Sequence, residues 1–350
     1  MSGLLEVLQP GIGTTVQDRG RHGHRHHGLP LSGWLDAPLA QAANALLGND
    51  LNAAVFELRG LGTVLRVQRG PVRVALAGPI GAQRVREDGA RTPLPAWQTA
   101  TLHEGQILQL GSADSGCAYL AVAGGITLAP AFGSRASYWR AGLCGVLGRA
   151  FQPGDVLPCG EAGSADPREW RYRSPWEPAT GPIRVMSGPQ DDHFTADALA
   201  RFLAQAWQAT PAQDRMGLRL QGEPLTHASA AAADIVSDGV TPGAIQVPAN
   251  GQPIVLLADG QTVGGYPKIA TVITADLPRL AHLRPGTRVR FVAVTAEQAH
   301  EALIAQHRRW QQWLTGREAF LPPGHIDEAA LYSANLISGM LAGHPEEDRP

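Results

Sequence analysis

The chain has 350 residues, of which 44% are hydrophobic and 17% charged, and its formal net charge is −2. This composition allows a substantial core and excludes a disordered protein, and the near-neutral charge does not favour binding to nucleic acid or anionic membranes. The first residues do not resemble a signal peptide, and no stretch approaches about 18 uninterrupted apolar residues, so we expect no membrane span. The three cysteines (Cys117, Cys144 and Cys159) are widely spaced, which fits a cytoplasmic protein in a reducing environment.

Glycine and proline indicate the architecture. The 41 glycines and 27 prolines are spread along the chain, and this pattern favours many short strands joined by tight turns over a helical bundle. The strand-like runs, in chain order, are Leu4–Leu8, Thr63–Val67, Val72–Ala77, Ile107–Leu110, Cys117–Val122, Ile183–Met186, Ile254–Leu257, Ile269–Ile273 and Val289–Val294. We therefore expect a mainly β protein with a few helices.

Three helices are predicted from capping residues and apolar periodicity. The first begins at Asp36 and ends at Gly48, the second follows Thr195, and the third begins with a capping box from Thr295 to Gln298. Their apolar stripes are Leu39, Ala42, Ala43 and Leu46 in the first; Leu199, Phe202, Leu203 and Ala206 in the second; and Ala299, Leu303, Trp310 and Leu314 in the third. We expect each stripe to pack in the core rather than to form a ligand surface.

A segment rich in charge and proline, Glu161–Pro182, separates two β-rich halves and is the best candidate for a linker. We expect a first domain over residues 1–165, a second over 180–295 that contains the GGYPK motif, and a C-terminal helix and tail over 296–350. The openings of the two halves, LEVLQPG and IRVMSGP, are too different to establish a duplication.

The first candidate site lies in Pro10–Asn49, where turn-forming residues surround the polar side chains Thr15, Gln17, Asp18 and Arg21. Arg21 either pairs with Asp18 and fixes the loop, or holds a ligand carboxylate in a bidentate fork. A satisfied turn is an equal alternative for this segment.

Four histidines follow directly: His22, His24, His26 and His27. Alternate residues share a face in a strand, so three of them could in principle converge on a metal ion. The Arg and Gly residues between them do not resemble a closed metal site with supporting carboxylates. We therefore expect a solvated loop and no metal.

The second candidate site is Ser237–Ala270, in which glycines and prolines surround Gln246, Asp259, Gln261 and other polar residues. Such density suggests backbone that lies close to a ligand or to another chain. Neither GxxxxGK[ST] nor GxGxxG is present, so a standard nucleotide-binding loop is not supported. Lys268 is the one lysine of the chain, and it is either a surface residue or an ammonium that pairs with a carboxylate or transfers a proton.

A third group, Gln213–Gly222, contains Asp214, Arg215 and Arg219. A salt-linked turn is favoured here over a functional role, because Arg–Asp pairs commonly anchor loops. No GxSxG motif occurs, and the local sequence indicates no Cys–His pair. The residue directly before Lys268 is a proline and not a methionine, so a biotin attachment motif is absent.

An ordered set of motifs runs from about Gly11 to Phe291. They are PGIGTTVQDRGR, GLPLSGWLD, AANALLGN, FELRG, YLAVAGGI, FGSRAS, GRAFQPGD, SGPQDDHF, DRMGLRLQG, SDGVTPGAIQVPANGQPIVLLADGQTVGGYPKIATVI and RPGTRVRF. Together they resemble the biotin-dependent carboxyltransferase-like family, in the branch called carboxyltransferase subdomains C and D or allophanate hydrolase subunit 2, and most closely the C subunits of 5-oxoprolinases. This resemblance implies two cyclophilin-like β-barrel domains.

The resemblance also implies a function within a complex. Members of this type form the C component in the ATP-dependent opening of 5-oxoproline to glutamate, with an A-type partner protein and a B-type partner protein of carboxyltransferase subdomains A and B. ATP would be used by the complex, since this chain has no nucleotide motif. The alternatives are a carboxyltransferase component of a urea or amide carboxylase, with biotin on another chain, and a non-catalytic regulatory subunit. Trp34, Tyr138 and Trp139 are expected to be exposed at a partner interface.

Opening a lactam requires donors that polarise its carbonyl, and groups that orient the substrate. The predicted catalytic residues are Lys268, Asp259, Gln261 and Thr262. The predicted substrate-binding residues are Thr15, Gln17, Asp18, Arg21, Gln246 and Tyr266, and no metal ligand is predicted.

Overall fold

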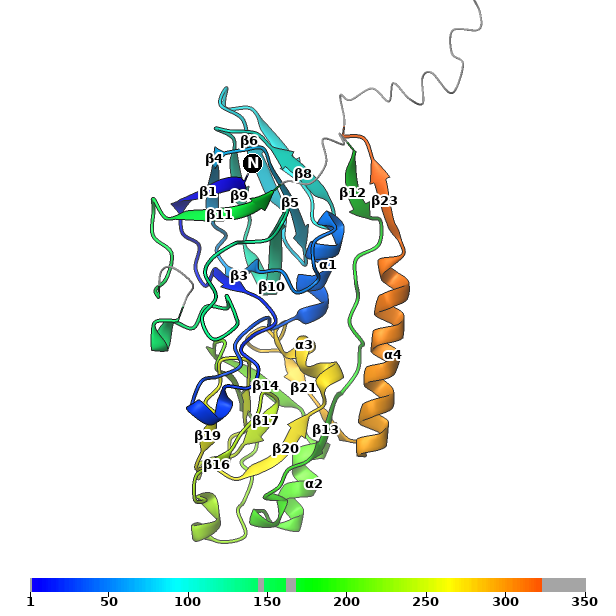
Figure 1. Cartoon of the computed structure of the whole chain (residues 1–350). Helices are drawn as coiled ribbons and strands as arrows, with labels where there is room; N and C mark the ends of the chain where they lie inside the picture. The colour runs from blue at the N-terminus through cyan, green and yellow to red at the C-terminus, as the bar shows by residue number, and fades with distance from the viewer. Residues whose placement is uncertain (1, 144–147, 162–167, 323–350) are drawn as a thin grey trace, which may run out of the picture.

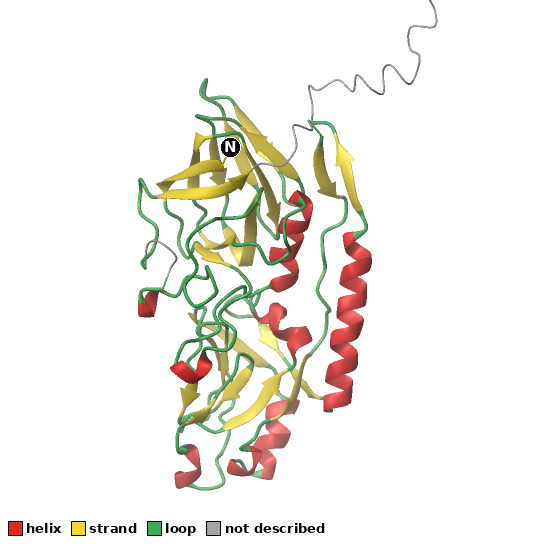
Figure 2. Cartoon of the chain, in the orientation of Figure 1, coloured by secondary structure: helices red, strands yellow, loops and turns green. Residues whose placement is uncertain are grey.

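The computed structural model describes residues 2–143, 148–161 and 168–322. Within these ranges strands outnumber helices, which confirms the mainly β prediction (Figure 2). Each predicted strand run contains a strand, because alternating or continuous apolar residues bounded by turn residues fit a pleated, half-buried surface. In the described part of the chain, no helix combines the length and the apolar character needed to cross a membrane.

The first half consists of two antiparallel sheets that pack around a common core (Figure 1). One sheet contains β1 (Ser2–Gln9), β4 (Val64–Arg69), β6 (Ala82–Val85), β7 (Arg91–Leu94), β9 (Ile107–Leu110) and β11 (Val156–Glu161), in the order β11-β1-β4-β9-β6-β7. The other contains β2 (Thr15–Gln17), β3 (Val55–Gly60), β5 (Val72–Ala77), β8 (Thr99–Leu102) and β10 (Ala113–Val122), in the order β2-β3-β10-β5-β8.

Helix α1 (Ala37–Leu47) covers β5 and β10 of the second of these sheets. Its N-cap Asp36 accepts a hydrogen bond from the backbone N–H of Leu39 at 3.0 Å, and Gly48 ends the helix in the left-handed region at φ 71°. Both ends were predicted from the sequence, and the first apolar stripe is buried as expected.

The second half is built on one eight-stranded sheet in the order β21-β14-β15-β18-β17-β20-β13-β22. Its strands are β13 (Ile183–Ser187), β14 (Trp207–Gln213), β15 (Gly217–Gln221), β17 (Ala244–Gln246), β18 (Ile254–Leu256), β20 (Lys268–Val272), β21 (Arg288–Val289) and β22 (Phe291–Ala293). The two edge strands β21 and β22 are separated by Arg290 alone, so the edges come together and the sheet is nearly closed into a barrel.

Shorter elements complete this half. They are α2 (Ala196–Ala204), α3 (Leu277–Leu280), the small pair β16 (Asp238–Gly239) and β19 (Val263–Gly264), and the 3-10 turns η3 (Asp191–His193), η4 (Ala230–Ala233) and η5 (Thr274–Asp276). Helix α2 follows Thr195, whose side chain accepts from the N–H of Ala198 at 3.2 Å. Phe202 of α2 is buried against the core as predicted, whereas Leu203 is 36% exposed.

Helix α4 (Ala296–Leu314) runs along both halves (Figure 1). Its predicted capping box is confirmed, since Thr295 and Gln298 exchange hydrogen bonds. Gln306 donates to the carbonyl of Ala275 at 2.9 Å in the second half, and Arg317, just after the helix, donates to the carbonyl of Ala45 at 2.6 Å in the first. The helix therefore ties the halves together.

Two sequence expectations are corrected in this region. The segment predicted as a linker contains β12 (Glu169–Tyr172), which pairs with β23 (Arg317–Phe320) after α4, while residues 162–167 lie outside the described residues. Leu303, predicted in the buried stripe of α4, is 38% exposed, because α4 packs on the body through a narrow side centred on Trp310. The predicted tail beyond residue 322 also lies outside the described residues.

Candidate functional site

A cleft of about 620 Å³ lies between the two halves and receives residues from both. Its lining combines polar floor residues, arginines and apolar walls. It includes Ile12, Thr15, Arg59, Ser137, Tyr138, Trp139 and Arg140 from the first half, and Asp214, Arg215, Met216, Asp259, Ala281, Leu283, Arg284 and Pro285 from the second. Clefts of this size at domain boundaries are the usual place for small-molecule sites.

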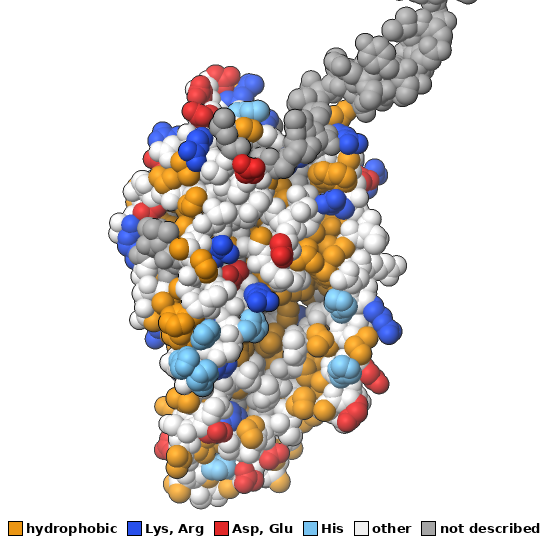
Figure 3. All heavy atoms as spheres, viewed as in Figure 1, with side chains coloured by type: hydrophobic (Ala, Val, Ile, Leu, Met, Phe, Trp, Pro, Cys, Tyr) orange, Lys and Arg blue, Asp and Glu red, His pale blue; other side chains and the backbone are white. Residues whose placement is uncertain are grey.

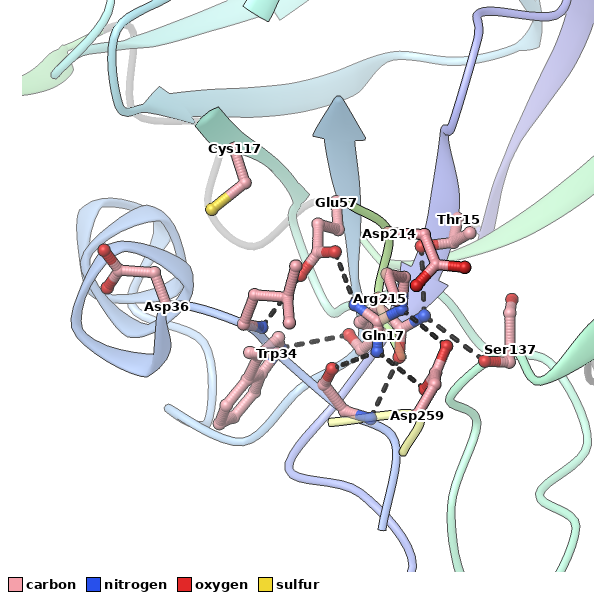
Figure 4. Close-up of polar contacts among 12 residues, drawn as sticks. Thr15, Gln17, Trp34, Asp36, Glu57, Cys117, Ser137, Asp214, Arg215 and Asp259 are labelled. Carbon is pink, nitrogen blue, oxygen red and sulfur yellow. Dashed lines mark hydrogen bonds and ion pairs between the residues drawn. The ribbon is translucent and has the colours of Figure 1, made fainter. Parts of the chain in front are cut away.

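Arg215 occupies the floor of the cleft and joins the halves (Figure 4). It donates to both carboxylate oxygens of Asp259, at 2.9 and 3.1 Å, and forms a further ion pair with Glu57 of β3. It also donates to the carbonyl of Gly33 at 2.6 Å. Burial disfavours its charge, but the two carboxylates outweigh this cost and raise the pKa of the Arg215 guanidinium. Arg215 thus anchors the floor and is not a free donor.

The carboxylate of Glu57 continues this network into the first half. Its second oxygen accepts from the hydroxyl of Tyr119 at 2.7 Å and from the N–H of Leu35 at 3.0 Å. The Tyr119 hydroxyl accepts in turn from the N–H of Asp36 at 2.9 Å. Burial raises the pKa of Tyr119 well above its usual value, so this phenol stays protonated and bridges the two segments.

Asp36 also contacts His282, a residue of the second half that lies just after α3. The Nε2 of His282 lies 2.8 Å from a carboxylate oxygen of Asp36 and 3.9 Å from the sulfur of buried Cys117. Burial disfavours the imidazolium, yet hydrogen bonds to Asp36 and Cys117 raise the pKa of His282 to about 11. Burial raises the pKa of the Cys117 thiol. The local sequence carries no sign of this Cys–His contact, because the two residues are 165 positions apart.

The predicted N-terminal cluster lies beside and beneath the cleft. Thr15 lines it, and Gln17 donates to the Thr15 hydroxyl at 3.0 Å and accepts from the N–H of Gly33 at 3.1 Å. Gln17 is fully buried, and its backbone carbonyl accepts a hydrogen bond from the indole N–H of Trp34 at 3.1 Å. These contacts hold the loop that carries Thr15 against the floor.

Asp18 and Arg21 hold the opposite loop, at residues 134–136. Asp18 accepts from the hydroxyl of Ser134 at 2.5 Å and from the N–H of Arg135 at 2.6 Å, and Arg21 donates to the carbonyl of Ala136. Both side chains are buried. Their contacts position the segment that leads into Ser137 and Tyr138 of the cleft.

A second cleft of about 520 Å³ adjoins the first and shares Arg140, Asp214 and Met216 with it. Gln246, Gln261 and Tyr266, all predicted site residues, line this second cleft. The side chain of Gln261 donates to that of Gln246 at 3.1 Å. The structure therefore brings together predicted residues of two separate motifs in adjoining spaces.

Lys268 and Thr262 line neither cleft. Lys268 is 3% exposed, and its ammonium donates to the carboxylate of Asp238 at 2.6 Å and to the carbonyl of Gly239 at 3.2 Å. The hydrogen bond from Lys268 lowers the pKa of Asp238. The carbonyl of Thr262 accepts from the N–H of Val240 at 3.0 Å. The catalytic roles assigned to these two residues stay predictions.

Sequence reasoning missed the polar residues that join the halves. Arg215 was expected in a local salt-linked turn, but its ion pairs reach Glu57 and Asp259, and the turn is instead held by Asp214, which accepts from the N–H of Met216 at 2.8 Å. Glu57 carried one usable signal, an acidic residue inside the apolar strand VFELRG. His282 carried none.

The predicted partner aromatics are not all exposed. Trp139 is 41% exposed, whereas Trp34 and Tyr138 are partly buried. Tyr138 and Trp139 line the first cleft, and burial, followed by the charge of Asp259, raises the pKa of Tyr138. They are thus placed for a ligand as well as for a partner.

The histidine segment includes the 3-10 turn η1 (Arg25–His27), and His22, His26 and His27 are exposed. Figure 3 shows histidine side chains on the lower half of one face, among mixed charges. Among the residues that the structure describes, no group of three or more His, Cys, Asp or Glu side chains could hold a metal ion.

Comparisons with known proteins agree on one family. The model described as the carboxyltransferase domain, subdomain A and B, matches residues 27–293. The chain is 37% identical to the C subunit of 5-oxoprolinase from Escherichia coli (strain K12) over 321 residues, which is 88% of this chain and 97% of that protein. It is 33% identical to the Haemophilus influenzae protein of the same name, over 85% of this chain and 93% of that protein.

Among solved structures, the urea amidolyase of Kluyveromyces lactis matches with a TM-score of 0.77 and 25% identity. The match covers 89% of this chain and 20% of that chain, so this fold corresponds to one segment of a much longer protein. One detail of the expected family is corrected: the matching model is that of subdomains A and B, rather than of subdomains C and D.

Proposed function

Because this chain belongs to the carboxyltransferase domain family, subdomain A and B, we propose that it is the C subunit of an ATP-dependent 5-oxoprolinase in the cytoplasm. The observation that carries the proposal is the share of each relative's length that this chain covers. The chain spans 97% of the Escherichia coli C subunit but 20% of the urea amidolyase chain. A protein that matches one component of a complex along its whole length is best placed in the same kind of complex.

The reaction sets the demands on the site. Opening of 5-oxoproline consumes ATP and water and yields glutamate, ADP and phosphate, and the lactam carbonyl must be phosphorylated or polarised before water attacks. Donors that face the developing charge supply the necessary stabilisation. In the interdomain cleft these donors are the hydroxyls of Thr15, Ser137 and Tyr138, and the amides of Gln246 and Gln261 line the adjoining space.

The proposed complex contains two other chains. Since this chain matches subdomains A and B, its B-type partner would carry the complementary subdomains C and D, and an A-type protein would complete the enzyme. ATP would be used by the complex, and this chain carries no standard nucleotide-binding loop. Partly exposed Trp139 beside the cleft supports an interface at this edge.

Reconstitution tests this proposal. The chain, co-expressed with homologues of the A-type and B-type proteins from the same genome, should support 5-oxoproline-dependent ATP hydrolysis, and omission of this chain is the matched control. With the B-type homologue alone it should co-elute from a sizing column at micromolar concentration. Separate elution, together with no 5-oxoproline-dependent hydrolysis by the full set, would reject the proposal.

A second candidate is a carboxyltransferase component of a biotin-dependent urea or amide carboxylase, and the TM-score of 0.77 to urea amidolyase favours it. Biotin would have to be on another chain, because the one lysine here is 3% exposed. Urea-dependent ATP hydrolysis with a biotinylated partner would select this candidate. A third candidate, a regulatory role, would be selected if the A-type and B-type homologues were active alone and this chain changed their rate.

A further inference from the structure

Three arginines that line the interdomain cleft are candidates for binding a ligand. Arg59 lies on β3, Arg140 in η2 (Trp139–Ala141), and Arg284 in the loop that follows α3. Among the side chains that the structure describes, none of the three forms an ion pair. Other arginines do: Arg184, for example, pairs with Asp276 at 2.8 Å.

The acidic side chains described on the cleft wall are Asp214 and Asp259, and neither forms an ion pair with these arginines. Both oxygens of Asp259 accept from Arg215. One oxygen of Asp214 accepts from the N–H groups of Met216 and Gly217, at 2.8 and 3.2 Å, which holds this exposed side chain in its own turn. The three arginines are therefore positive charges from three separate elements that line one space, and no ion pair among the described side chains neutralises them.

The rest of the wall is largely apolar. Ile12 and Met216 lie on it, and Ala281, Leu283 and Pro285 line the part next to Arg284. A wall that combines apolar surface with unpaired guanidinium groups suits a small ring that carries a carboxylate. Guanidinium forks recognise carboxylates in a bidentate geometry, and such charge-assisted hydrogen bonds are about twice as strong as neutral ones.

We propose that Arg59, Arg140 and Arg284 are specificity-determining residues that bind the carboxylate of an anionic lactam and thereby disfavour neutral amides such as urea. This inference rests on the proposed function and adds the substrate class of the cleft. The lactam carbonyl faces the hydroxyl donors of the floor, while the arginines at the wall hold the acid group. A hydrogen bond to a charged group contributes about 1.5–3 kcal/mol, which corresponds to roughly 10- to 150-fold in affinity.

The test uses the reconstituted complex with the triple variant Arg59→Gln/Arg140→Gln/Arg284→Gln and the three single variants. Glutamine keeps a polar side chain but removes the charge. The matched control is Arg308→Gln, an exposed arginine of α4 that does not line the cleft. We expect the triple variant to raise the KM for 5-oxoproline at least 10-fold with kcat within about threefold, and the control to match the wild type.

Binding measured by calorimetry separates the two proposals. The wild-type complex should bind 5-oxoproline at least 10-fold more tightly than 2-pyrrolidinone, the same ring without the carboxylate, and the triple variant should lose this preference. Activity with 5-oxoproline but an unchanged KM in the triple variant overturns the arginine assignment and leaves the proposed function intact. Selective binding of 5-oxoproline without turnover overturns the proposed function alone, and absence of both binding and turnover overturns both.

Discussion

Arg215 of the second half donates a hydrogen bond to the buried carboxylate of Glu57 in the first half, 158 positions earlier in the chain. The same guanidinium holds Asp259, so one cation pairs with two buried carboxylates at the point where the halves meet. Glu57 is fully buried and its other oxygen is occupied by Tyr119. The relative position of the cleft walls therefore depends on this ion pair.

Arg215→Met should destabilise the protein by about 3–5 kcal/mol, because it leaves the carboxylates of Glu57 and Asp259 buried without a counter-charge. The measurement is the free energy of unfolding by denaturant titration. Arg219→Met is the matched control: Arg219 is exposed on the adjacent strand, and its loss should cost less than about 0.5 kcal/mol. Equal effects of the two variants would contradict the role of Arg215.

His282 should make stability depend on pH. Its folded pKa of about 11 exceeds the unfolded value of 6.5, so its contribution is fully present below pH 6.5 and is lost as the pH rises through 11. We expect His282→Asn to cost about 1–3 kcal/mol at pH 6 and progressively less at pH 8 and 10. A difference that stays constant with pH, or an imidazole that titrates near 6.5 by NMR, would contradict this assignment.

The packing of α4 against the rest of the protein should depend on the aromatic side chain of Trp313. Trp313 stacks on Tyr172 with ring centroids 3.9 Å apart and contacts Trp97 edge-on at 5.6 Å. Trp313→Ala should lower the free energy of unfolding by about 1–3 kcal/mol, since it removes this aromatic packing from a partly buried position. Leu303→Ala on the exposed side of the same helix should cost less than about 1 kcal/mol. A smaller loss for Trp313→Ala than for Leu303→Ala would show that α4 is not anchored there.

Lys268→Arg separates the predicted catalytic role of this residue from its ion pair with Asp238. A guanidinium can also pair with this partly exposed carboxylate, so we expect the melting temperature to change little. A group that acts on the reacting centre predicts a fall in turnover of about 10²-fold, because the larger guanidinium cannot replace a compact or titratable ammonium. Unchanged turnover would assign Lys268 to the structural ion pair alone.

Local features of the fold were readable from the sequence. The N-cap Asp36, the C-terminal Gly48 and the capping box from Thr295 to Gln298 all lie where they were predicted. Capping and strand alternation act between residues a few positions apart, so the sequence determines them directly. Family membership followed from the order of many such motifs, and the comparisons corrected only the pair of subdomains.

The site was decided by tertiary structure. Its ion pairs join residues separated by 44 to 246 positions, from Arg215 with Asp259 to Asp36 with His282. No spacing rule encodes such contacts, because they exist only when the nearly closed barrel of the second half docks on α1 and β3 of the first. The sequence by itself therefore determined the three longer helices, many of the strands, the β class and the family of this protein. Packing of the two halves alone decided which charges are buried as pairs and which arginines face the cleft.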